Sequence, residues 1–348
     1  MPGHALHSIR AHPRVGGIRA LLLAASVASG CGTPPQVAPT PTVALPPWTP
    51  YVAPTALPTH SVSETPAPTA TSLPPQVHSD LSYATLSESQ RLDLYLPAGE
   101  GPFPLVIYVH GGGWILGDKL EPFSNGIVDF LVQRGFGVAS VNYRLSDEAK
   151  FPAQVHDVKA AVRWLRAHAS EFGLDPNRFG AWGDSAGGNL VAMLGTSCGA
   201  AALEGGDLGS AEQSSCVQAI VDWYGPMDFI KIDGQFAGTS CPQNHSQGNS
   251  IESDYLGTPI LRAPDLVQAA NPITYVSSDE PPFLIQHGTA DCVVPVQQSQ
   301  QLHDALAAAN DPGKVVLSTL QGAAHGGPEF LSPANLGFVL AFLQMYLR

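Results

Sequence analysis

The 348-residue sequence predicts an α/β fold, with helices on both faces of a mostly parallel central sheet. From about residue 80, short continuous apolar runs alternate with longer helical patterns, as they do where crossover helices join parallel strands. With 44% hydrophobic residues, the chain can also bury a large core. No internal repeat is visible, so we expect one domain over residues 80–348.

The predicted strands begin in the segment 83–97, where Leu92, Leu94 and Leu96 share one face of one or two antiparallel strands. The apolar run 104–110 predicts a strand buried on both faces. Similar runs predict further strands at 137–143, 178–183, 217–224, 282–287 and 315–320.

Helical patterns fill the intervals between these strands. The longest, 152–172, has a proline at its start and Gly173 just past its end, as helix termini prefer. The other predicted helices are 123–134, 186–195, 296–310 and 328–347. The stretch between 224 and 282 shows no regular pattern, and we expect it to be irregular.

Residues 1–30 predict an export signal of the lipoprotein type. Arg10 and Arg14 precede the apolar stretch 18–27, and Arg19 lies at its start. The stretch is too short to span a bilayer and ends in small residues. The ending Val-Ala-Ser-Gly-Cys resembles the lipobox of bacterial lipoproteins, although Ala28 stands where that motif usually has leucine. We therefore expect Cys31 to be lipidated. The alternative is an ordinary cleaved signal with a coincidental cysteine.

Residues 31–79 differ in composition from the rest of the chain. Thirteen prolines fall between Pro34 and Pro75, and Glu64 is the only charged residue. This composition favours an extended polyproline II spacer, which would hold the folded domain away from a membrane or envelope surface. The net charge of −13 predicts no binding to nucleic acid, and contact with a membrane only through the lipid anchor. The oligomeric state is left open.

The pentapeptide Gly183-Asp184-Ser185-Ala186-Gly187 lies between a predicted strand and a predicted helix. Gly-x-Ser-x-Gly in this setting is typical of a nucleophile elbow, whose strained turn needs glycine on both sides of the serine. We expect Ser185 to be a nucleophile, with the Ala186 N–H at a helix N-terminus. Asp184 is expected to make structural hydrogen bonds behind the turn.

A second glycine-rich motif, His110-Gly111-Gly112-Gly113-Trp114, follows the strand 104–110. Consecutive glycines allow backbone N–H groups to converge on one point. Gly112 and Gly113, together with Ala186, are therefore expected to form an oxyanion hole.

Three residues near these motifs are candidates for a substrate pocket. Trp114 adjoins the oxyanion glycines, and Tyr224 and Pro226 follow the strand 217–224. Each could line an acyl or alcohol pocket, and each could equally lie in the core or at the rim.

A serine nucleophile needs a base and a group that orients the base. His325 follows the last strand in Gly-Ala-Ala-His-Gly-Gly-Pro, and Asp291 follows the strand 282–287. The order Ser185, Asp291, His325 is that of an α/β-hydrolase. The remaining candidates are His245, His287 and His303 for the base, and Asp222 and Asp228 for the acid.

These motifs, with Asn142-Tyr143-Arg144, Asp222-Trp223-Tyr224-Gly225-Pro226 and His287-Gly288-Thr289-Ala290-Asp291, resemble those of the hormone-sensitive-lipase-like carboxylesterases. Within that group the chain is most similar to microbial acetylxylan and feruloyl esterases, over about residues 85–348. The resemblance implies an α/β-hydrolase fold and a serine carboxylester hydrolase without metal or organic cofactor. Its substrates would be acetyl, feruloyl, aryl or short acyl esters, small or polymer-linked. One departure is Ala324, where glycine commonly precedes the catalytic histidine.

If Cys31 is lipidated, four cysteines remain, which allow three pairings. Cys198 ends the helix after the nucleophile and Cys216 opens the next strand, so we expect the disulfide Cys198–Cys216. Cys241–Cys292 would then tie the irregular segment to the loop of Asp291. Four free thiols are the alternative, but an exported protein favours disulfides.

Two other functions are compatible with parts of this pattern. A serine peptidase of the prolyl-oligopeptidase type has the same triad order, but the His-Gly-Gly-Gly motif and the short N-terminal region argue against it. A non-catalytic surface-binding module on a hydrolase fold would be favoured by the loss of a triad residue, and all three residues are present.

Overall fold

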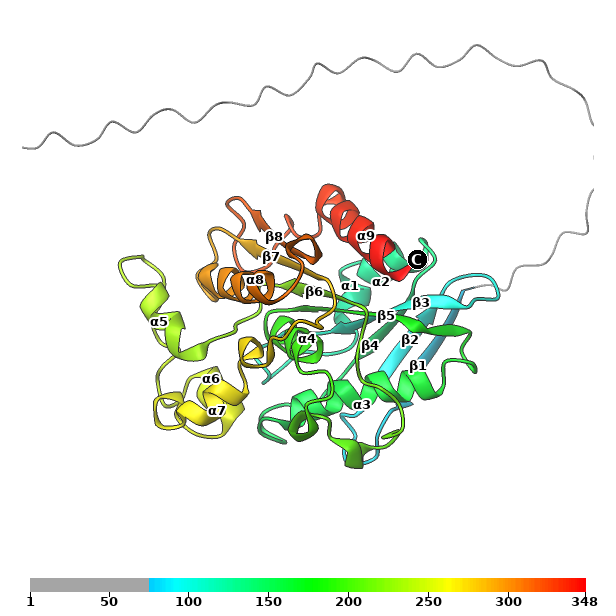
Figure 1. Cartoon of the computed structure of the whole chain (residues 1–348), viewed down its shortest axis with the longest axis horizontal. Coiled ribbons are helices and arrows are strands. Elements are labelled where there is room, and N and C mark those ends of the chain that lie inside the picture. Colours follow the sequence, from blue (N-terminus) through cyan, green and yellow to red (C-terminus); the bar gives the residue numbers. More distant parts are fainter. Residues whose placement is uncertain (1–74) are drawn as a thin grey trace, which may run out of the picture. The chain divides into compact units, whose positions relative to one another are not determined.

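The computed structural model describes residues 75–348 (Figure 1). The predicted signal peptide, the lipidation site at Cys31 and nearly all of the proline-rich spacer lie outside the described residues, so they stay predictions. Within residues 75–348, no helix is both long enough and apolar enough to cross a membrane.

The core of the fold is an eight-stranded sheet with the strand order β1-β2-β4-β3-β5-β6-β7-β8 (Figure 1). β2 pairs antiparallel with both β1 and β4, and every other pair is parallel. The mostly parallel sheet predicted from the sequence is confirmed. The strands are β1 Gln76–Ser82, β2 Arg91–Leu96, β3 Phe103–Val109, β4 Gly137–Val141, β5 Leu174–Asp184, β6 Ala219–Trp223, β7 Phe283–Gly288 and β8 Val315–Leu320.

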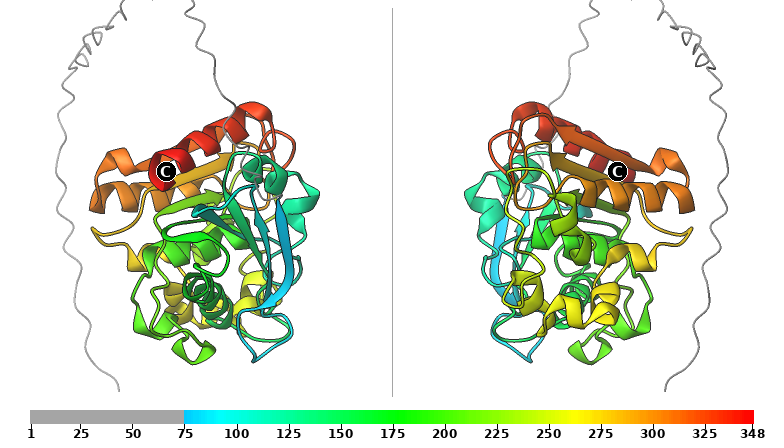
Figure 2. Two further views of the ribbon diagram at one scale, coloured as in Figure 1. Left: turned by 90° about the vertical axis from the view of Figure 1, so that its right-hand side faces the viewer. Right: turned by 90° about the vertical axis from the view of Figure 1, so that its left-hand side faces the viewer.

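Helices cover both faces of this sheet (Figure 2). Alternate residues of β3 point to opposite faces: Leu105 and Ile107 join a core that includes α3 and α4, whereas Val106 and Tyr108 join a core that includes α2 and α9. The helices are α1 Glu121–Ser124, α2 Ile127–Val132, α3 Ala153–Ala167, α4 Ala186–Thr196, α5 Ile232–Gln235, α6 Ile251–Leu256, α7 Pro264–Ala269, α8 Gln297–Ala309 and α9 Pro333–Leu347.

Two predicted elements differ from the structure. The segment 83–97 contributes only β2, while its antiparallel partner is β1, whose exposed and mostly polar residues gave no apolar signal. The predicted helix 123–134 is divided into α1 and α2 by Gly126, which has a left-handed φ of 85°. The segment between β6 and β7, predicted to be irregular, holds the short helices α5, α6 and α7.

Candidate active site

Ser185 occupies the sharp turn between β5 and α4. Its backbone angles, φ 52° and ψ −119°, are rare for any residue other than glycine. A Cβ on Gly183 would come within 2.3 Å of the Gly187 carbonyl oxygen, and a Cβ on Gly187 within 2.1 Å of the Val109 carbonyl oxygen. The close approach of these backbones therefore requires both glycines of the motif.

Ser185, His325 and Asp291 form a continuous hydrogen-bonded chain. His325 Nε2 lies 2.8 Å from Ser185 Oγ, and His325 Nδ1 lies 2.7 Å from Asp291 Oδ2. Because a carboxylate only accepts, Nδ1 carries the proton that is donated to Asp291. Nε2 then presents its lone pair to the serine hydroxyl, as a general base requires. The structure thus brings together the three residues expected from the sequence.

Asp291 is buried, and its second oxygen, Oδ1, accepts hydrogen bonds from the backbone N–H groups of Val293 and Val294 at 2.7 and 2.9 Å. Burial alone would raise the pKa of Asp291. Hydrogen bonds from His287 and His325 outweigh that effect and hold the pKa well below its ordinary value. Asp291 is therefore a carboxylate throughout the neutral range and can stabilise a protonated His325.

His287, an alternative base in the sequence, supports Asp291 instead. Its Nε2 lies 2.8 Å from the carbonyl oxygen of Val294 and 3.3 Å from Asp291 Oδ2, so Nε2 carries a proton. Its Nδ1 lies 2.7 Å from Ser299 Oγ. With both ring nitrogens engaged and the side chain fully buried, His287 holds the Asp291 loop in place.

The other candidate acids and bases lie apart from this chain. Asp228 Oδ2 pairs with Lys231 Nζ at 2.8 Å, and Asp222 Oδ1 accepts the backbone N–H of Gly225 at 3.0 Å. His303 lies on α8, with Nδ1 3.0 Å from Asp304 Oδ1. None of these three has a hydrogen bond to Ser185, Asp291 or His325 in the part of the chain that the structure describes.

The expected oxyanion residues lie beside Ser185. Gly112 and Gly113 have positive φ angles of 95° and 60°, and both line the same cavity as Ser185. Ala186 is the first residue of α4. Among the described residues, the N–H groups of Gly112, Gly113 and Ala186 donate to no backbone carbonyl. They are therefore available to a substrate oxygen that becomes negatively charged.

The cavity above Ser185 has a volume of about 630 Å³. Tyr224 and Phe330 form an aromatic wall, as the sequence suggested for Tyr224. Ile251 and Val293 add apolar side chains to the lining, and Glu121 of α1 adds a carboxyl group. A cavity of this size, apolar with a few polar groups, is typical of small-molecule sites.

Two carboxyl groups of the cavity, Asp184 and Glu121, interact with each other. Burial raises the pKa of Asp184 to about 7, the negative charge of Glu121 adds to this effect, and the hydroxyl of Tyr108, which donates to Asp184 Oδ1 at 2.8 Å, opposes it. Burial also raises the pKa of Glu121. Glu121 could not be expected from the sequence, because its four-residue helix carries no motif.

The structure places two of the three candidate pocket residues, Trp114 and Pro226, in the core, which was the alternative left open by the sequence. Trp114 is 1% exposed and stacks on Tyr255, with ring centroids 4.2 Å apart. The positive φ angles of Gly113 and Trp114 turn the chain there, so that the indole enters the core. Pro226 is also buried, and its carbonyl oxygen accepts a hydrogen bond from Asn189 at 2.8 Å. Neither residue lines the cavity.

Residues 75–348 contain two disulfides, Cys198–Cys216 and Cys241–Cys292. These are the two pairings expected from the sequence, and Cys292 directly follows Asp291. Disulfides are typical of exported proteins. Within residues 75–348, no group of three or more His, Cys, Asp or Glu side chains is arranged to hold a metal ion.

Comparisons of the chain with known proteins agree on one family. Residues 92–306 match the BD-FAE family. Esterase LipC of Mycobacterium tuberculosis is 31% identical over 248 residues, which are 71% of this chain and 58% of LipC. A probable isoprenylcysteine alpha-carbonyl methylesterase of Arabidopsis thaliana, ICMEL1, is 30% identical over 68% of this chain and 48% of its own length. The chain thus spans about half the length of the curated relatives that it matches.

Solved structures agree with this result. A truncated carbohydrate esterase from gut microbiota has a TM-score of 0.70 at 31% identity, covering 78% of this chain and 95% of that one. A bifunctional GH43-CE protein of Bacteroides eggerthii has a TM-score of 0.69 at 33% identity, covering 77% of this chain and 35% of that one. With the family match over 92–306 and the eight-stranded sheet, the chain belongs to the BD-FAE family of α/β-hydrolase esterases.

Proposed function

We propose that this protein hydrolyses carboxylic esters through an acyl-enzyme formed on Ser185. The observation that carries the proposal is the hydrogen-bonded chain from Ser185 Oγ through His325 to Asp291, at 2.8 and 2.7 Å, at the wall of an accessible cavity. The relatives described as esterases and carboxylic ester hydrolases support the same reaction class. The free N–H groups of Gly112, Gly113 and Ala186 favour acyl transfer over simple ligand binding.

In the first half of the reaction, Ser185 Oγ attacks the ester carbonyl carbon while His325 Nε2 accepts the hydroxyl proton. The carbonyl oxygen becomes an oxyanion, which the N–H groups of Gly112, Gly113 and Ala186 stabilise. The ester C–O bond then breaks, and His325 gives its proton to the departing alcohol. Asp291 remains ionised and stabilises the positive imidazolium throughout.

In the second half, water replaces the alcohol. His325 removes a proton from the water as its oxygen attacks the acyl carbon, and the same N–H groups stabilise the second oxyanion. The bond from the acyl carbon to Ser185 Oγ breaks, Oγ regains its proton from His325, and the carboxylic acid leaves.

For the substrate class, we propose acetyl, feruloyl or other short acyl and aryl esters of carbohydrates. The support comes from two structural neighbours described as a carbohydrate esterase and as a GH43-CE bifunctional protein. The cavity of about 630 Å³ is large enough for an aryl acyl group beside Tyr224 and Phe330.

The test compares wild type with Ser185→Ala on acetyl, butyryl and feruloyl esters, with a peptide amide as the control for peptidase activity. Loss of the nucleophile should lower kcat on the order of 10⁶-fold while circular dichroism stays unchanged. A serine-directed organophosphate should label the peptide that contains Ser185 in wild type and not in the variant. Normal ester turnover by a folded Ser185→Ala protein would refute the proposal, and faster cleavage of the peptide amide would favour a peptidase.

We also propose that residues 1–30 direct export and that lipidated Cys31 anchors the chain. The proline-rich spacer, predicted as residues 31–79 but shortened at its end by β1 at Gln76–Ser82, would separate the anchor from the hydrolase domain. The lipobox-like ending at Cys31 and the two disulfides support this arrangement. Mass spectrometry of the mature N-terminus should find an acylated Cys31. An unmodified terminus created by cleavage elsewhere would refute the anchor.

A further inference from the structure

The lining of the active-site cavity carries two carboxyl groups that no neighbouring cation balances. Glu121 and Asp184 both line the cavity beside Ser185. Among the described lining residues there is no lysine or arginine, and the one histidine, His325, already pairs with Asp291. A substrate that binds over Ser185 therefore meets two carboxyl groups and no permanent positive charge.

Glu121 is the carboxyl group that a substrate can contact. It is half-buried on α1, and within the described part of the chain its carboxyl group has neither a hydrogen-bond donor nor a basic partner. Asp184 is buried and already accepts the hydroxyl of Tyr108 at 2.8 Å. Glu121 thus keeps its full capacity to accept hydrogen bonds, whereas Asp184 adds mainly its charge.

Burying these two groups together is unfavourable in the free protein. Burial raises the pKa of Glu121, and burial followed by the negative charge of Glu121 raises the pKa of Asp184. Both effects arise because the carboxylates lose water and gain no cation in exchange. A bound cation would be attracted by both carboxylates and would relieve the repulsion between them.

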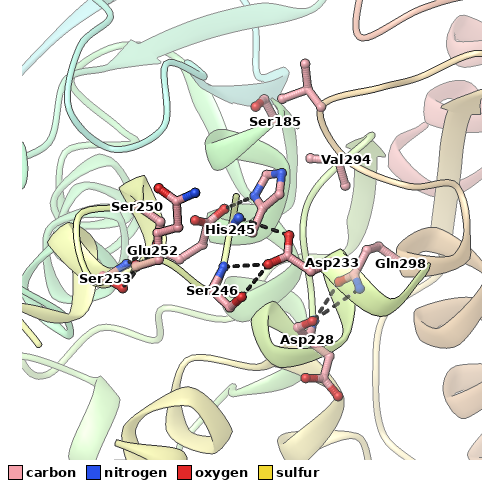
Figure 3. Close-up of polar contacts among 12 residues, drawn as sticks. Ser185, Asp228, Asp233, His245, Ser246, Ser250, Glu252, Ser253, Val294 and Gln298 are labelled. Carbon is pink, nitrogen blue, oxygen red and sulfur yellow. Dashed lines mark hydrogen bonds and ion pairs between the residues drawn. The ribbon is translucent and has the colours of Figure 1, made fainter. Parts of the chain in front are cut away.

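Another buried carboxyl group near the site does have a basic partner (Figure 3). Glu252 Oε1 lies 2.6 Å from Nδ1 of His245, which the sequence offered as a candidate base. The loop that holds this pair is fixed by Asp233, which accepts the backbone N–H groups of His245 and Ser246 at 3.0 and 2.9 Å (Figure 3). The protein thus supplies a cation for Glu252 and none for Glu121, whose carboxyl group opens into the cavity.

The aromatic part of the lining also suits a cation. Tyr224 and Phe330 pack edge-to-face with ring centroids 4.6 Å apart, and Trp223 lies 5.2 Å from Phe330 in the same lining. Aromatic rings attract ammonium groups, most strongly where water is excluded. Tyr224 is 7% exposed, and its hydroxyl has no hydrogen-bond partner among the described residues, so it can accept from an ammonium N–H.

We propose that Glu121 selects esters that carry an ammonium group near the ester bond, and that esters with an anionic group there are poor substrates. This inference rests on the proposed function and specifies the charge of its substrates. The ammonium group interacts with the Glu121 carboxylate and the aromatic rings, and Asp184 adds a second negative charge. An anionic group would be repelled by both carboxylates. The ammonium group can belong to the acyl part or to the alcohol part, because both lie over Ser185 during the reaction.

The test uses pairs of esters that have the same shape and differ in charge. For the alcohol part, acetylcholine is compared with 3,3-dimethylbutyl acetate, in which carbon replaces the charged nitrogen. For the acyl part, the 4-nitrophenyl ester of 4-(trimethylammonio)butyrate is compared with that of 5,5-dimethylhexanoate. In the pair whose charged part reaches Glu121, kcat/KM of the wild type should favour the cation about tenfold or more. The other pair should show a smaller preference, which identifies the part that carries the ammonium group.

Glu121→Gln should reduce the preference for the cation at least about fivefold, because the amide keeps the shape of the side chain and removes its charge. Glu121→Lys is the second variant, and it should reverse the preference in favour of the 4-nitrophenyl monoester of adipic acid. The matched control is Asp129→Asn on α2, which removes an exposed carboxylate that does not line the cavity. Circular dichroism checks the fold of each variant.

Three results would overturn selection by Glu121 while leaving ester hydrolysis intact. The first is a wild-type preference near one in both pairs. The second is an unchanged preference in Glu121→Gln. The third is an equal reduction in Glu121→Gln and Asp129→Asn, which would show that the overall charge of the protein attracts the cation. A wild-type protein inactive on every ester would instead refute the proposed function itself.

Discussion

The aromatic ring of Tyr224 packs edge-on against the imidazole of His325, with ring centroids 4.6 Å apart and an interplanar angle of 60°. Tyr224 directly follows β6 and has an unusual φ of 44°, and its N–H donates to the carbonyl oxygen of Gln286 at 2.8 Å. The strained backbone thus aims the ring at His325, the proposed base, and Phe330 packs against the ring as well. Tyr224 acts as a positioning residue for His325.

Replacing this ring should change kcat more than KM. Tyr224→Ala removes the contact with His325, and we expect kcat to fall about five- to tenfold, in line with the ~1 kcal/mol that an aromatic pair contributes. Tyr224→Phe keeps the ring and should restore nearly all of the activity. Steady-state kinetics on a short aryl ester checks both variants. Equal losses for Phe and Ala would show that the hydroxyl matters and the ring contact does not.

The identity of the acid is tested by two matched variants. Asp291→Asn removes the charge that stabilises protonated His325, so kcat should fall about 10³- to 10⁴-fold. Asp228→Asn changes a carboxylate whose partner is Lys231 and should leave activity close to wild type. Circular dichroism must show that both variants fold, because Asp291 also accepts two backbone N–H groups. An active Asp291→Asn beside an inactive Asp228→Asn would reverse the assignment.

The proposed oxyanion hole depends on the backbone at Gly112. A Cβ there would meet the carbonyl oxygen of Leu116 at 2.2 Å, and the φ of 95° is unfavourable for alanine. Gly112→Ala must therefore shift the N–H groups of the turn, and kcat should fall about 10²- to 10³-fold.

Gly209→Ala is the matched control for Gly112→Ala. Its φ of 101° is equally unfavourable, but nothing lies within 4 Å of the added Cβ, and Gly209 does not line the active-site cavity. It should lower the melting temperature and leave kcat unchanged. Comparable kcat losses in both variants would mean that strain alone explains the effect of Gly112→Ala.

The sequence predicted the parallel strands well because both of their faces are buried. The apolar run at 104–110 became β3 at Phe103–Val109, and that at 282–287 became β7 at Phe283–Gly288. β1 was not predicted from the sequence, because an edge strand with exposed side chains needs no apolar pattern. The triad could be expected because each member follows a strand, and the carboxyl ends of parallel strands meet at one edge of the sheet.

Side-chain direction and pairing inside irregular segments could not be predicted. Trp114 adjoins the oxyanion glycines in sequence, yet the turn sends its indole into the core. His245 and Glu252 are seven residues apart, and only the fold of the loop brings Nδ1 to 2.6 Å from the carboxyl group. No periodicity in the sequence encodes such a contact, because it depends on Asp233 and the disulfide Cys241–Cys292.

The two disulfides should differ in what their removal affects. In the loop-entropy description, the separation of 51 residues between Cys241 and Cys292 corresponds to about 4 kcal/mol of stability. The separation of 18 residues between Cys198 and Cys216 corresponds to about 3 kcal/mol. Only the first disulfide ends next to Asp291.

We therefore expect the double variant Cys241→Ser/Cys292→Ser to lose both stability and kcat/KM, and Cys198→Ser/Cys216→Ser to lose stability alone. Denaturant unfolding and ester kinetics on the same preparations measure the two effects. Unchanged kinetics in the variant without Cys241–Cys292 would show that this disulfide does not affect the active site.

The last prediction concerns Asp222, which is fully buried beneath the elbow helix. Oδ1 accepts the N–H of Gly225, whereas Oδ2 has no partner among the described side chains and backbone groups. Burial raises the pKa of Asp222 to about 7, against the opposing effects of the Gly225 hydrogen bond and the charge of His287. The folded protein therefore holds this proton at a pH where the unfolded chain, with a carboxyl pKa near 3.9, has already released it.

The sign of the pH effect is set by this difference. The contribution of Asp222 to the free energy of unfolding is fully present below about pH 4. It is lost as the pH rises to about 7, at about 1.4 kcal/mol per pH unit. Asp184, whose pKa is also raised to about 7, acts in the same direction. Asp291 acts in the opposite direction, because its pKa is lowered and its contribution is lost only as the pH falls below about 4.

Asp222→Asn should therefore reduce the fall in unfolding free energy between pH 5 and pH 8 by about 3 kcal/mol, since asparagine does not titrate. Denaturant unfolding of wild type and variant at several pH values measures this, and Asp279→Asn, at an exposed position, is the control. The absolute stability at pH 5 can drop, because the amide must fit a site that now holds a protonated carboxyl group. The pH dependence of the unfolding free energy still reports the release of the Asp222 proton. Parallel stability curves for wild type and Asp222→Asn would show that Asp222 does not titrate in this range.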